Sequence, residues 1–193
     1  MKESIQFLQA FLKNPGKVGS ITPSSDELAL EMLSGVKPSR NNIILELGCG
    51  TGAITRHIQK ILPDQNCYLG VELDQNLVMG LNKEFSDLQF VCGDARNARN
   101  IHRESGLGRV GYVICGLPFV LMPAEIGEAI WTEVDGFMDE GCMFRTFQYA
   151  HGYYMPTALK LREHMRTRYG FSKRSKLVVK NVPPAFTLTW HSA

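Results

Sequence analysis

The sequence contains no apolar run long enough to span a bilayer, no closely spaced cysteine pair and no strong excess of charge of either sign. A formal net charge of +2 gives no bulk attraction to nucleic acid. The five cysteines stand singly, which favours reduced, buried thiols over disulfides. The histidines show no metal-ligand spacing, and no cleavage site follows the short apolar stretch IQFLQAFL. We therefore expect a cytoplasmic protein without a bound metal.

Internal repeats, low-complexity tracts and long linkers are also absent from the sequence. At 193 residues, of which 44% are apolar, the chain fits one domain with a sizeable buried core. We expect a single domain over residues 1–193. Within it, residues 1–20 are predicted to form an amphipathic helix and a lid segment, and residues 21–193 the core fold.

From residue 43 onwards, short apolar runs alternate with segments of helical pattern. The runs of strand length are NIILEL, CYLGVEL, LQFVCGD, GYVICGLPF and CMFRTFQY. This alternation is typical of successive βα units and predicts an α/β fold with a mostly parallel sheet. The last two runs, SKLVVKNV and AFTLTWHS, are separated only by Pro183 and Pro184, which predicts an antiparallel pair at the sheet edge. Residues 96–109 are polar and predict a loop or a short irregular helix.

A glycine-rich turn, ELGCGTG at residues 46–52, follows the first strand-like run. Read permissively, it also fits the G-x-G-x-x-G/A pattern of dinucleotide-binding folds. Glu46 argues against a bound pyrophosphate, because like charges would meet at short range. A cationic ligand without phosphate suits the turn better. S-adenosylmethionine is such a ligand, because its ammonium and sulfonium groups favour carboxylates and its bulk requires glycines for close backbone approach.

Two further carboxylates stand at the ends of the next two strand-like runs. Glu72 in VELD lies about 20 residues past the last glycine, where an acidic side chain can accept from ribose hydroxyls. Asp94 in FVCGDA is placed to accept from an adenine amine. The carboxyl ends of successive parallel strands meet at the edge where open α/β sheets bind ligands. Simpler roles stay open, since Glu46 and Asp94 could each cap a helix and Glu72 could be a solvated strand end.

Taken together, ELGCGTG, VELD and GDA resemble the motifs of class I S-adenosylmethionine-dependent methyltransferases, and the match runs from residue 43 to residue 190 by strand order. The resemblance implies a Rossmann-like fold with a mostly parallel seven-stranded sheet and an antiparallel final hairpin. It also implies cofactor-binding residues. These are Glu46, Gly48, Gly50 and Gly52 at the methionine end, Glu72 at the ribose, Asp94 and Ala95 at the adenine, and Thr22 and Ser24 closing over the cofactor.

The run CGLPF, residues 115–119, lies where this family determines the methyl acceptor. Methyltransferases that act on adenine amines carry Asn or Asp at the position of Gly116, and that side chain accepts a hydrogen bond from the base amine. A buried base amine without this partner would lose roughly 1 to 3 kcal/mol of recognition. An RNA adenine N-methyltransferase of the rRNA dimethylase type is therefore the alternative and not the first expectation.

Several segments resemble bacterial phospholipid N-methyltransferases, which methylate phosphatidylethanolamine. They are NPGKVGSITPSSDELA, CGLP, FQYAHGYYMP and NVPPAF. Two positions depart from the pattern of that family, because Cys115 replaces a serine and Gln148 stands where threonine is usual. The resemblance implies methyl transfer to the amine of a lipid headgroup. It places the acceptor near Leu117, Pro118, Tyr149 and Asn181.

Two segments could hold such an enzyme on a membrane. In a helix at the N-terminus, one face would be apolar and could lie in the membrane interface; its residues are Ile5, Phe7, Leu8, Phe11 and Leu12. Residues 160–180 contain many basic residues and Glu163 as their single acidic residue, and could bind anionic lipids. The helix could equally pack on the core, and the basic segment could be a solvated face or bind RNA phosphates. We expect a phospholipid substrate and peripheral association with an anionic membrane surface.

Overall fold

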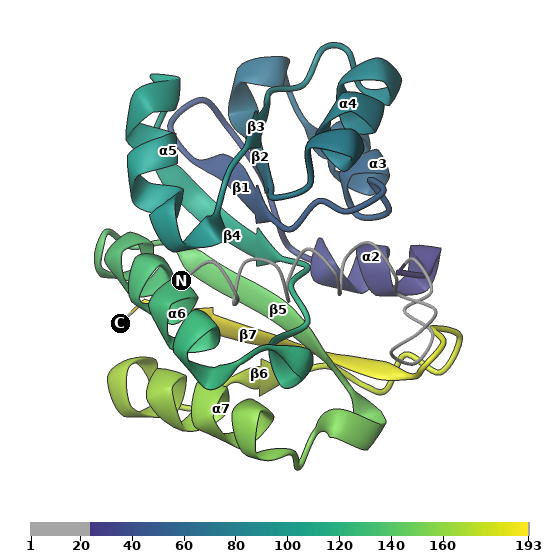
Figure 1. Ribbon diagram of the computed structural model, residues 1–193, viewed down its shortest axis with the longest axis vertical. Coiled ribbons are helices and arrows are strands. Elements are labelled where there is room, and N and C mark those ends of the chain that lie inside the picture. Colours follow the sequence, from purple (N-terminus) through teal and green to yellow (C-terminus); the bar gives the residue numbers. More distant parts are fainter. Residues whose placement is uncertain (1–23, 193) are drawn as a thin grey trace.

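The computed structural model describes residues 24–192, which form one sheet with helices on both faces (Figure 1). The helices are α2 (Asp26–Met32), α3 (Thr55–Ile58), α4 (Gln75–Glu84), α5 (Ala98–Ser105), α6 (Ala124–Asp139) and α7 (Pro156–Tyr169). The strands are β1 (Ile43–Leu47), β2 (Tyr68–Glu72), β3 (Phe90–Cys92), β4 (Val110–Cys115), β5 (Met143–Tyr149), β6 (Lys173–Arg174) and β7 (Ala185–His191). Short 3₁₀ turns follow three strands: η4 (Ala95–Asn97), η5 (Phe119–Leu121) and η6 (Ala150–Gly152). The predicted helix in residues 1–20 and Thr22 lie outside the described residues.

The strand order is β3-β2-β1-β4-β5-β7-β6. Strands β1 to β5 pair in parallel, and β7 runs antiparallel between β5 and β6. This confirms the predicted Rossmann-like α/β fold with a mostly parallel seven-stranded sheet and an antiparallel end. The chain changes direction across the sheet at β1, which has β2 on one side and β4 on the other. Open α/β sheets bind their ligands at the carboxyl end of such a switch point.

The central strands are mostly apolar because helices cover both faces of the sheet. Every residue of β1 and β2 is buried, as is typical of parallel strands in the middle of an α/β sheet. Helices α5, α6 and α7 cover one face, and α2, α3 and α4 cover the other (Figure 1). Alternate residues of β1 serve the two cores, since Leu45 packs with the α6 side and Ile44 with the α2 side. This packing holds the carboxyl ends of β1, β2 and β4 together.

The final hairpin differs from its prediction in where its first strand lies. Strand β6 is Lys173–Arg174, and within the run SKLVVKNV only Val178 pairs, through an isolated bridge to Ala185. The ladder ends at Ser175, because the Ser175 hydroxyl accepts the backbone N–H of Thr187 at 3.0 Å. A side chain that takes a backbone hydrogen bond competes with the ladder. The predicted strand at residues 175–182 is therefore corrected to a loop.

The segment at residues 96–109 also differs from its prediction. It contains the regular eight-residue helix α5, which ends at Gly106 in the left-handed conformation (φ 68°). Only Ala98 of α5 is fully buried and most of its residues are polar, so the helix has little of the apolar content that marks a packed helix in a sequence. The predicted loop or irregular helix is corrected to a regular helix that packs on the sheet.

Candidate active site

The turn after β1 has a backbone that requires glycine. Gly48, Gly50 and Gly52 have φ values of 76°, 56° and 80°, which side-chain-bearing residues adopt at a cost. A Cβ atom on Gly48 would also lie 2.5 Å from Cδ2 of Leu117 in the loop after β4. Glycine therefore lets the predicted cofactor turn and the predicted acceptor loop approach each other.

Glu72 holds this turn in place from the end of β2. Its side chain is only 2% exposed, and its Oε2 accepts the Gly50 backbone N–H at 2.8 Å. The other oxygen, Oε1, accepts the backbone N–H of Asp74 at 3.0 Å. Glu72 is therefore a buried, oriented carboxylate at the carboxyl edge of the sheet, and not a solvated strand end.

A narrow cleft brings together residues from three strand ends and the acceptor loop. Its predicted site residues are Gly48, Glu72, Asp94, Ala95 and Leu117, and its further lining residues are Val71, Leu73, Gly93 and Ile130. Apolar walls with a few fixed carboxylates are typical of sites that bind a nucleoside. The cleft lies at the end of the sheet where the strand order predicts ligand binding.

Asp94 is bound to a neighbouring arginine. It accepts hydrogen bonds from the Arg96 guanidinium at 2.5 and 3.0 Å and from the Arg96 backbone N–H at 2.9 Å. Burial tends to raise the pKa of Asp94, but the bonds from Arg96 outweigh it and lower the pKa. Asp94 thus caps η4, as the simpler interpretation allowed, and it remains a charged acceptor at the rim of the cleft.

Glu46 lies in a buried network between β1, β2 and α3. Its Oε2 accepts from Tyr68 Oη at 2.5 Å and from Thr55 Oγ1 at 2.7 Å. Gly70 permits the first bond, because a Cβ atom there would lie 2.6 Å from the Tyr68 hydroxyl. The interpretation of Glu46 as a helix cap is wrong, since α3 begins at Thr55 and its N-cap, Ile54, makes no side-chain capping bond.

The second carboxylate oxygen of Glu46, Oε1, has a different environment. Glu46 is fully buried, and its Oε1 has no hydrogen-bond partner within residues 24–192. Burial raises the pKa of Glu46 to about 7, against the hydrogen bonds from Tyr68 and Thr55, which lower it. The buried negative charge would be stabilised by a cation placed at Oε1.

This pKa predicts that Glu46 makes the stability of the cofactor-free protein depend on pH. Because the group titrates near 4.5 in the unfolded chain and near 7 in the folded one, the folded state binds more protons between these values. Stability should therefore fall as pH rises, by roughly 2 kcal/mol from about pH 5 to about pH 8. Urea unfolding of the wild type and of Glu46→Gln at both pH values isolates the contribution of Glu46 to the pH dependence of stability. Parallel pH dependences for the two proteins would show that Glu46 does not titrate in this window.

On the acceptor side, Leu117 and Tyr149 are both buried but lie in different cores. Leu117 belongs to the cluster on the α6 side, and Tyr149 to the cluster on the α2 side. Tyr149 stacks on His151 with centroids 5.7 Å apart, and burial raises the pKa of its phenol. Pro118 directly precedes η5. The end of β5 thus presents a buried, neutral phenol next to His151.

Asn181 joins the two ends of the described chain. Its side-chain oxygen accepts the backbone N–H of Ser25 at 2.8 Å, and its nitrogen donates to the carbonyl of Pro183 at 2.7 Å. The side chain is 1% exposed. In this arrangement Asn181 positions the segment that contains Ser24, which is half-buried and directly precedes the α2 N-cap.

The two positions that depart from the lipid methyltransferase pattern have different surroundings. Cys115 is fully buried, and burial raises its pKa to about 12, so the thiol is neutral. Gln148 is 1% exposed and accepts a 2.6 Å hydrogen bond from Arg162 on α7. Arg162 is a residue that sequence reasoning assigned only to a general basic segment.

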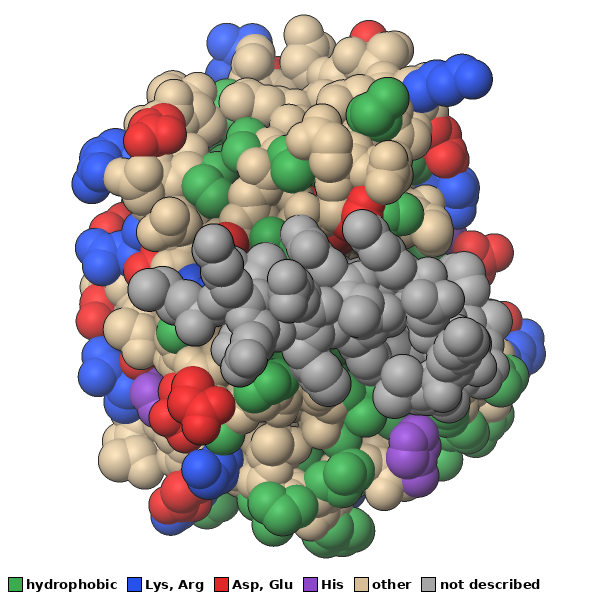
Figure 2. Space-filling view, viewed as in Figure 1, with side chains coloured by type: hydrophobic (Ala, Val, Ile, Leu, Met, Phe, Trp, Pro, Cys, Tyr) green, Lys and Arg blue, Asp and Glu red, His purple; other side chains and the backbone are tan. Residues whose placement is uncertain are grey.

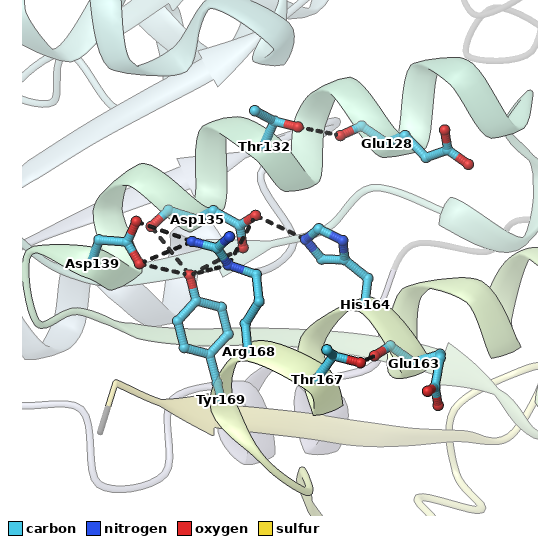
Figure 3. A network of polar contacts seen from close by, with 9 residues as sticks. All are labelled: Glu128, Thr132, Asp135, Asp139, Glu163, His164, Thr167, Arg168 and Tyr169. Carbon is cyan, nitrogen blue, oxygen red and sulfur yellow. Dashed lines mark hydrogen bonds and ion pairs between the residues drawn. The ribbon is translucent and has the colours of Figure 1, made fainter.

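The basic segment, residues 160–180, is partly neutralised by acidic residues, most of which come from elsewhere in the chain. The ion pairs are Lys160–Glu128, Arg166–Glu163, Arg168–Asp139 and Lys180–Glu27. Figure 3 shows how α6 and α7 approach, with Asp135 between His164 and Tyr169. On the face shown in Figure 2, acidic and basic side chains are interspersed. Within residues 24–192, the basic residues of this segment without an ion pair are Arg162, Lys173, Arg174 and Lys176.

Among the described residues, no three or more His, Cys, Asp or Glu side chains are grouped so that they could hold a metal ion. No helix in the same part of the chain is long and apolar enough to cross a bilayer.

Known proteins resemble this chain in sequence and in fold. A family model described as a methyltransferase domain matches residues 44–139. An ornithine lipid N-methyltransferase from Singulisphaera acidiphila is 29% identical over 130 residues, which are 65% of this chain and 67% of that protein. An rRNA methylase from Streptococcus thermophilus has 9% identity and a TM-score of 0.63 over 90% of this chain and 99% of that one. Magnesium protoporphyrin IX methyltransferase from Synechocystis PCC 6803, solved with bound SAM, has 13% identity and a TM-score of 0.60 over 87% and 77%. At these identities the solved structures show a shared fold.

Proposed function

Because the chain is a class I S-adenosylmethionine-dependent methyltransferase, we propose that it methylates the amine of a lipid headgroup, with phosphatidylethanolamine as the expected acceptor. The similarity to an ornithine lipid N-methyltransferase over 130 residues carries this proposal. Both lipids offer a primary amine next to an anionic group. An ornithine headgroup is therefore the second acceptor of the same chemical class.

We propose that the cleft and the glycine turn hold the cofactor. Glu72 would accept from the ribose hydroxyls, Asp94 and Ala95 would contact the adenine, and the turn from Gly48 would contact the methionine end. The unpartnered Oε1 of Glu46 fits an ammonium group, because a cation there would stabilise a buried carboxylate. When bound, S-adenosylmethionine supplies an electrophilic methyl group on a sulfonium.

On the acceptor side, the chain has to orient an amine and leave its lone pair free. Leu117 and Pro118 form the loop beside the cleft, and Tyr149 presents a neutral phenol and an aromatic face that would favour an ammonium before it loses its proton. Asn181 would act as a positioning residue through Ser25, and Thr22 and Ser24 would close over the cofactor.

The membrane association of the enzyme belongs to the same proposal. Residues 1–20 would form an apolar face at the lipid interface, within a single domain of residues 1–193 at the cytoplasmic membrane surface. The unpaired basic residues, of which Lys173 and Lys176 are exposed, would contribute about 1 kcal/mol each near anionic lipids.

Radiolabelled methyl transfer tests the proposed substrate class. Liposomes of phosphatidylethanolamine, liposomes of ornithine lipid and purified rRNA are compared in one buffer, each with anionic carrier lipid. We expect label in lipid amines, with kcat/KM rising about tenfold per pH unit below the pKa of the bound amine, because the amine must lose a proton before attack. Label in rRNA alone would overturn the proposal, and a flat pH profile would exclude an amine that is protonated when it binds.

A further inference from the structure

Two arginines near the acceptor loop share one aromatic ring. The guanidinium carbon of Arg162 lies 3.8 Å from the ring centroid of Tyr153, and that of Arg174 lies 5.2 Å from the same centroid. Arg174 also lies 4.8 Å from the ring centroid of Phe186. Within residues 24–192, neither arginine pairs with a carboxylate. Two like charges are therefore held close together without a counter-ion among the described residues.

The position of Arg162 is fixed by hydrogen bonds. One terminal nitrogen, Nη1, donates to Gln148 Oε1 at 2.6 Å and to the carbonyl of Tyr153 at 2.8 Å. Burial lowers the pKa of Arg162, and the charge of Arg174 lowers it further. The Arg162 guanidinium is thus oriented by the protein, and an anion near both guanidinium groups would relieve their repulsion.

Gln148 adds a second, independent observation. It is 1% exposed, and its Nε2 has no hydrogen-bond partner within residues 24–192. The reversed amide would place N–H donors against the Arg162 guanidinium, so the oxygen must face Arg162 and the nitrogen must face away. A buried donor without an acceptor costs stability unless a ligand or a water satisfies it.

These residues lie beside the acceptor loop and on its side of the sheet. Tyr153 packs against the hydrophobic cluster that contains Leu117 and Phe119. Helix α7 is joined to η5 by a 3.1 Å hydrogen bond from Thr157 Oγ1 to the carbonyl of Val120. A ligand whose anion met the arginines could therefore extend toward the predicted acceptor loop.

The surroundings are apolar and exposed. Tyr154 stands next to Tyr153, with ring centroids 5.3 Å apart, and is 79% exposed. Three more exposed apolar side chains lie in or next to helix α7, namely Met155, Leu159 and Phe171. Hydrophobic side chains also gather on the lower part of the face in Figure 2. Soluble proteins rarely leave such residues in a cluster unless they meet a membrane or a partner, and apolar flanks suit acyl chains better than RNA.

We propose that Arg162 and Arg174, oriented by Tyr153 and Gln148, form a subsite for the anionic group of the acceptor lipid. The ligand class is the phosphodiester of a phospholipid or the carboxylate of an amino-acid lipid, with Tyr154 and Phe171 facing the acyl region. This inference rests on the proposed lipid substrate. The subsite would orient the headgroup by its anion, so that the amine reaches the loop at Leu117.

Matched arginine variants test the subsite. Arg174→Gln and Arg168→Gln each remove one exposed charge from the same basic segment, but Arg168 pairs with Asp139 and lies outside the subsite. The Arg174 side chain makes no hydrogen bond among the described residues, so we expect its replacement to leave the fold intact. We expect Arg174→Gln to raise the KM for phosphatidylethanolamine or ornithine lipid liposomes by about tenfold, with little change in kcat. Arg168→Gln should resemble the wild type.

Binding of soluble headgroups separates this inference from the proposed reaction. Glycerophosphoethanolamine, ethanolamine and inorganic phosphate are titrated into the wild type and Arg174→Gln, with detection by calorimetry. Binding of glycerophosphoethanolamine that Arg174→Gln weakens supports the subsite, even if no lipid is methylated. Lipid methylation with equal KM for the two variants would overturn the subsite and leave the proposed function standing. Binding of inorganic phosphate alone would overturn the assignment to a lipid headgroup.

Discussion

Replacement of Glu72 by glutamine should weaken the binding of S-adenosylmethionine by roughly 10²-fold. The carboxylate is buried and oriented by the backbone N–H groups of Gly50 and Asp74. Glutamine keeps the shape of the side chain, but it has one acceptor oxygen and no charge. It would therefore lose part of the bonds to the ribose hydroxyls, and its amide group would face the N–H of Asp74 or Gly50.

Equilibrium dialysis of S-adenosylmethionine measures this effect directly, and methyl transfer at saturating cofactor shows whether kcat recovers. Glu84→Gln is the matched control, because Glu84 is an exposed carboxylate at the end of α4 that pairs with Arg56. It should change the Kd by less than about twofold. If Glu72→Gln bound the cofactor as tightly as Glu84→Gln does, the role of Glu72 would be limited to holding the glycine turn.

Replacement of Arg145 by methionine should give the largest loss of stability, about 3 to 4 kcal/mol. Arg145 is a buried residue of β5, and its Nη1 donates to the carbonyls of Met32 and Ser34 at 2.9 and 2.8 Å. Its Nε donates to Thr189 Oγ1 at 2.7 Å. Helix α2 has no basic residue in its own last turn, so Arg145 supplies the positive charge at its carboxyl end. Methionine would leave these carbonyls buried without a donor.

Urea unfolding of the cofactor-free protein measures the loss, which corresponds to a decrease of about 10 °C in Tm for a chain of this size. Arg40→Met is the control, because Arg40 makes an exposed ion pair with Asp64 and should cost less than about 1 kcal/mol. A similar, small loss in both variants would mean that water replaces Arg145 at the end of α2.

The local pattern of apolar and polar residues in the sequence was sufficient to predict most of the fold. The apolar runs at β1, β2 and β4 are continuous because both faces of these strands are covered, and such runs mark central parallel strands. The glycine spacing from Gly48 to Gly52 predicted a turn, since positive φ values favour glycine. Because Glu72 and Asp94 each stand at the end of a predicted strand, they were expected at one edge of the sheet. Both line the cleft at that edge.

Pattern failed where local order was decided by side-chain competition or where a helix has little apolar content. Residues 96–109 were expected to form a loop or a short irregular helix, because most residues of α5 are polar. The first strand of the final hairpin was misplaced because the Ser175 hydroxyl replaces a backbone acceptor in the ladder. In both segments polar side chains have more influence than the apolar content of the run.

The sequence by itself thus determined the class of fold, the glycine turn and the carboxylates at its edge, because these depend on residue type and short spacing. Only the tertiary structure decided how charges are used. It placed Tyr68 against Glu46, 22 positions away, and brought Glu128 and Glu27 to lysines that looked unopposed in the sequence. It also set Arg162 and Arg174 on one ring with no acidic partner among residues 24–192. Electrostatic interactions depend on distance in space and on burial, and neither can be read from the spacing of residues along a chain.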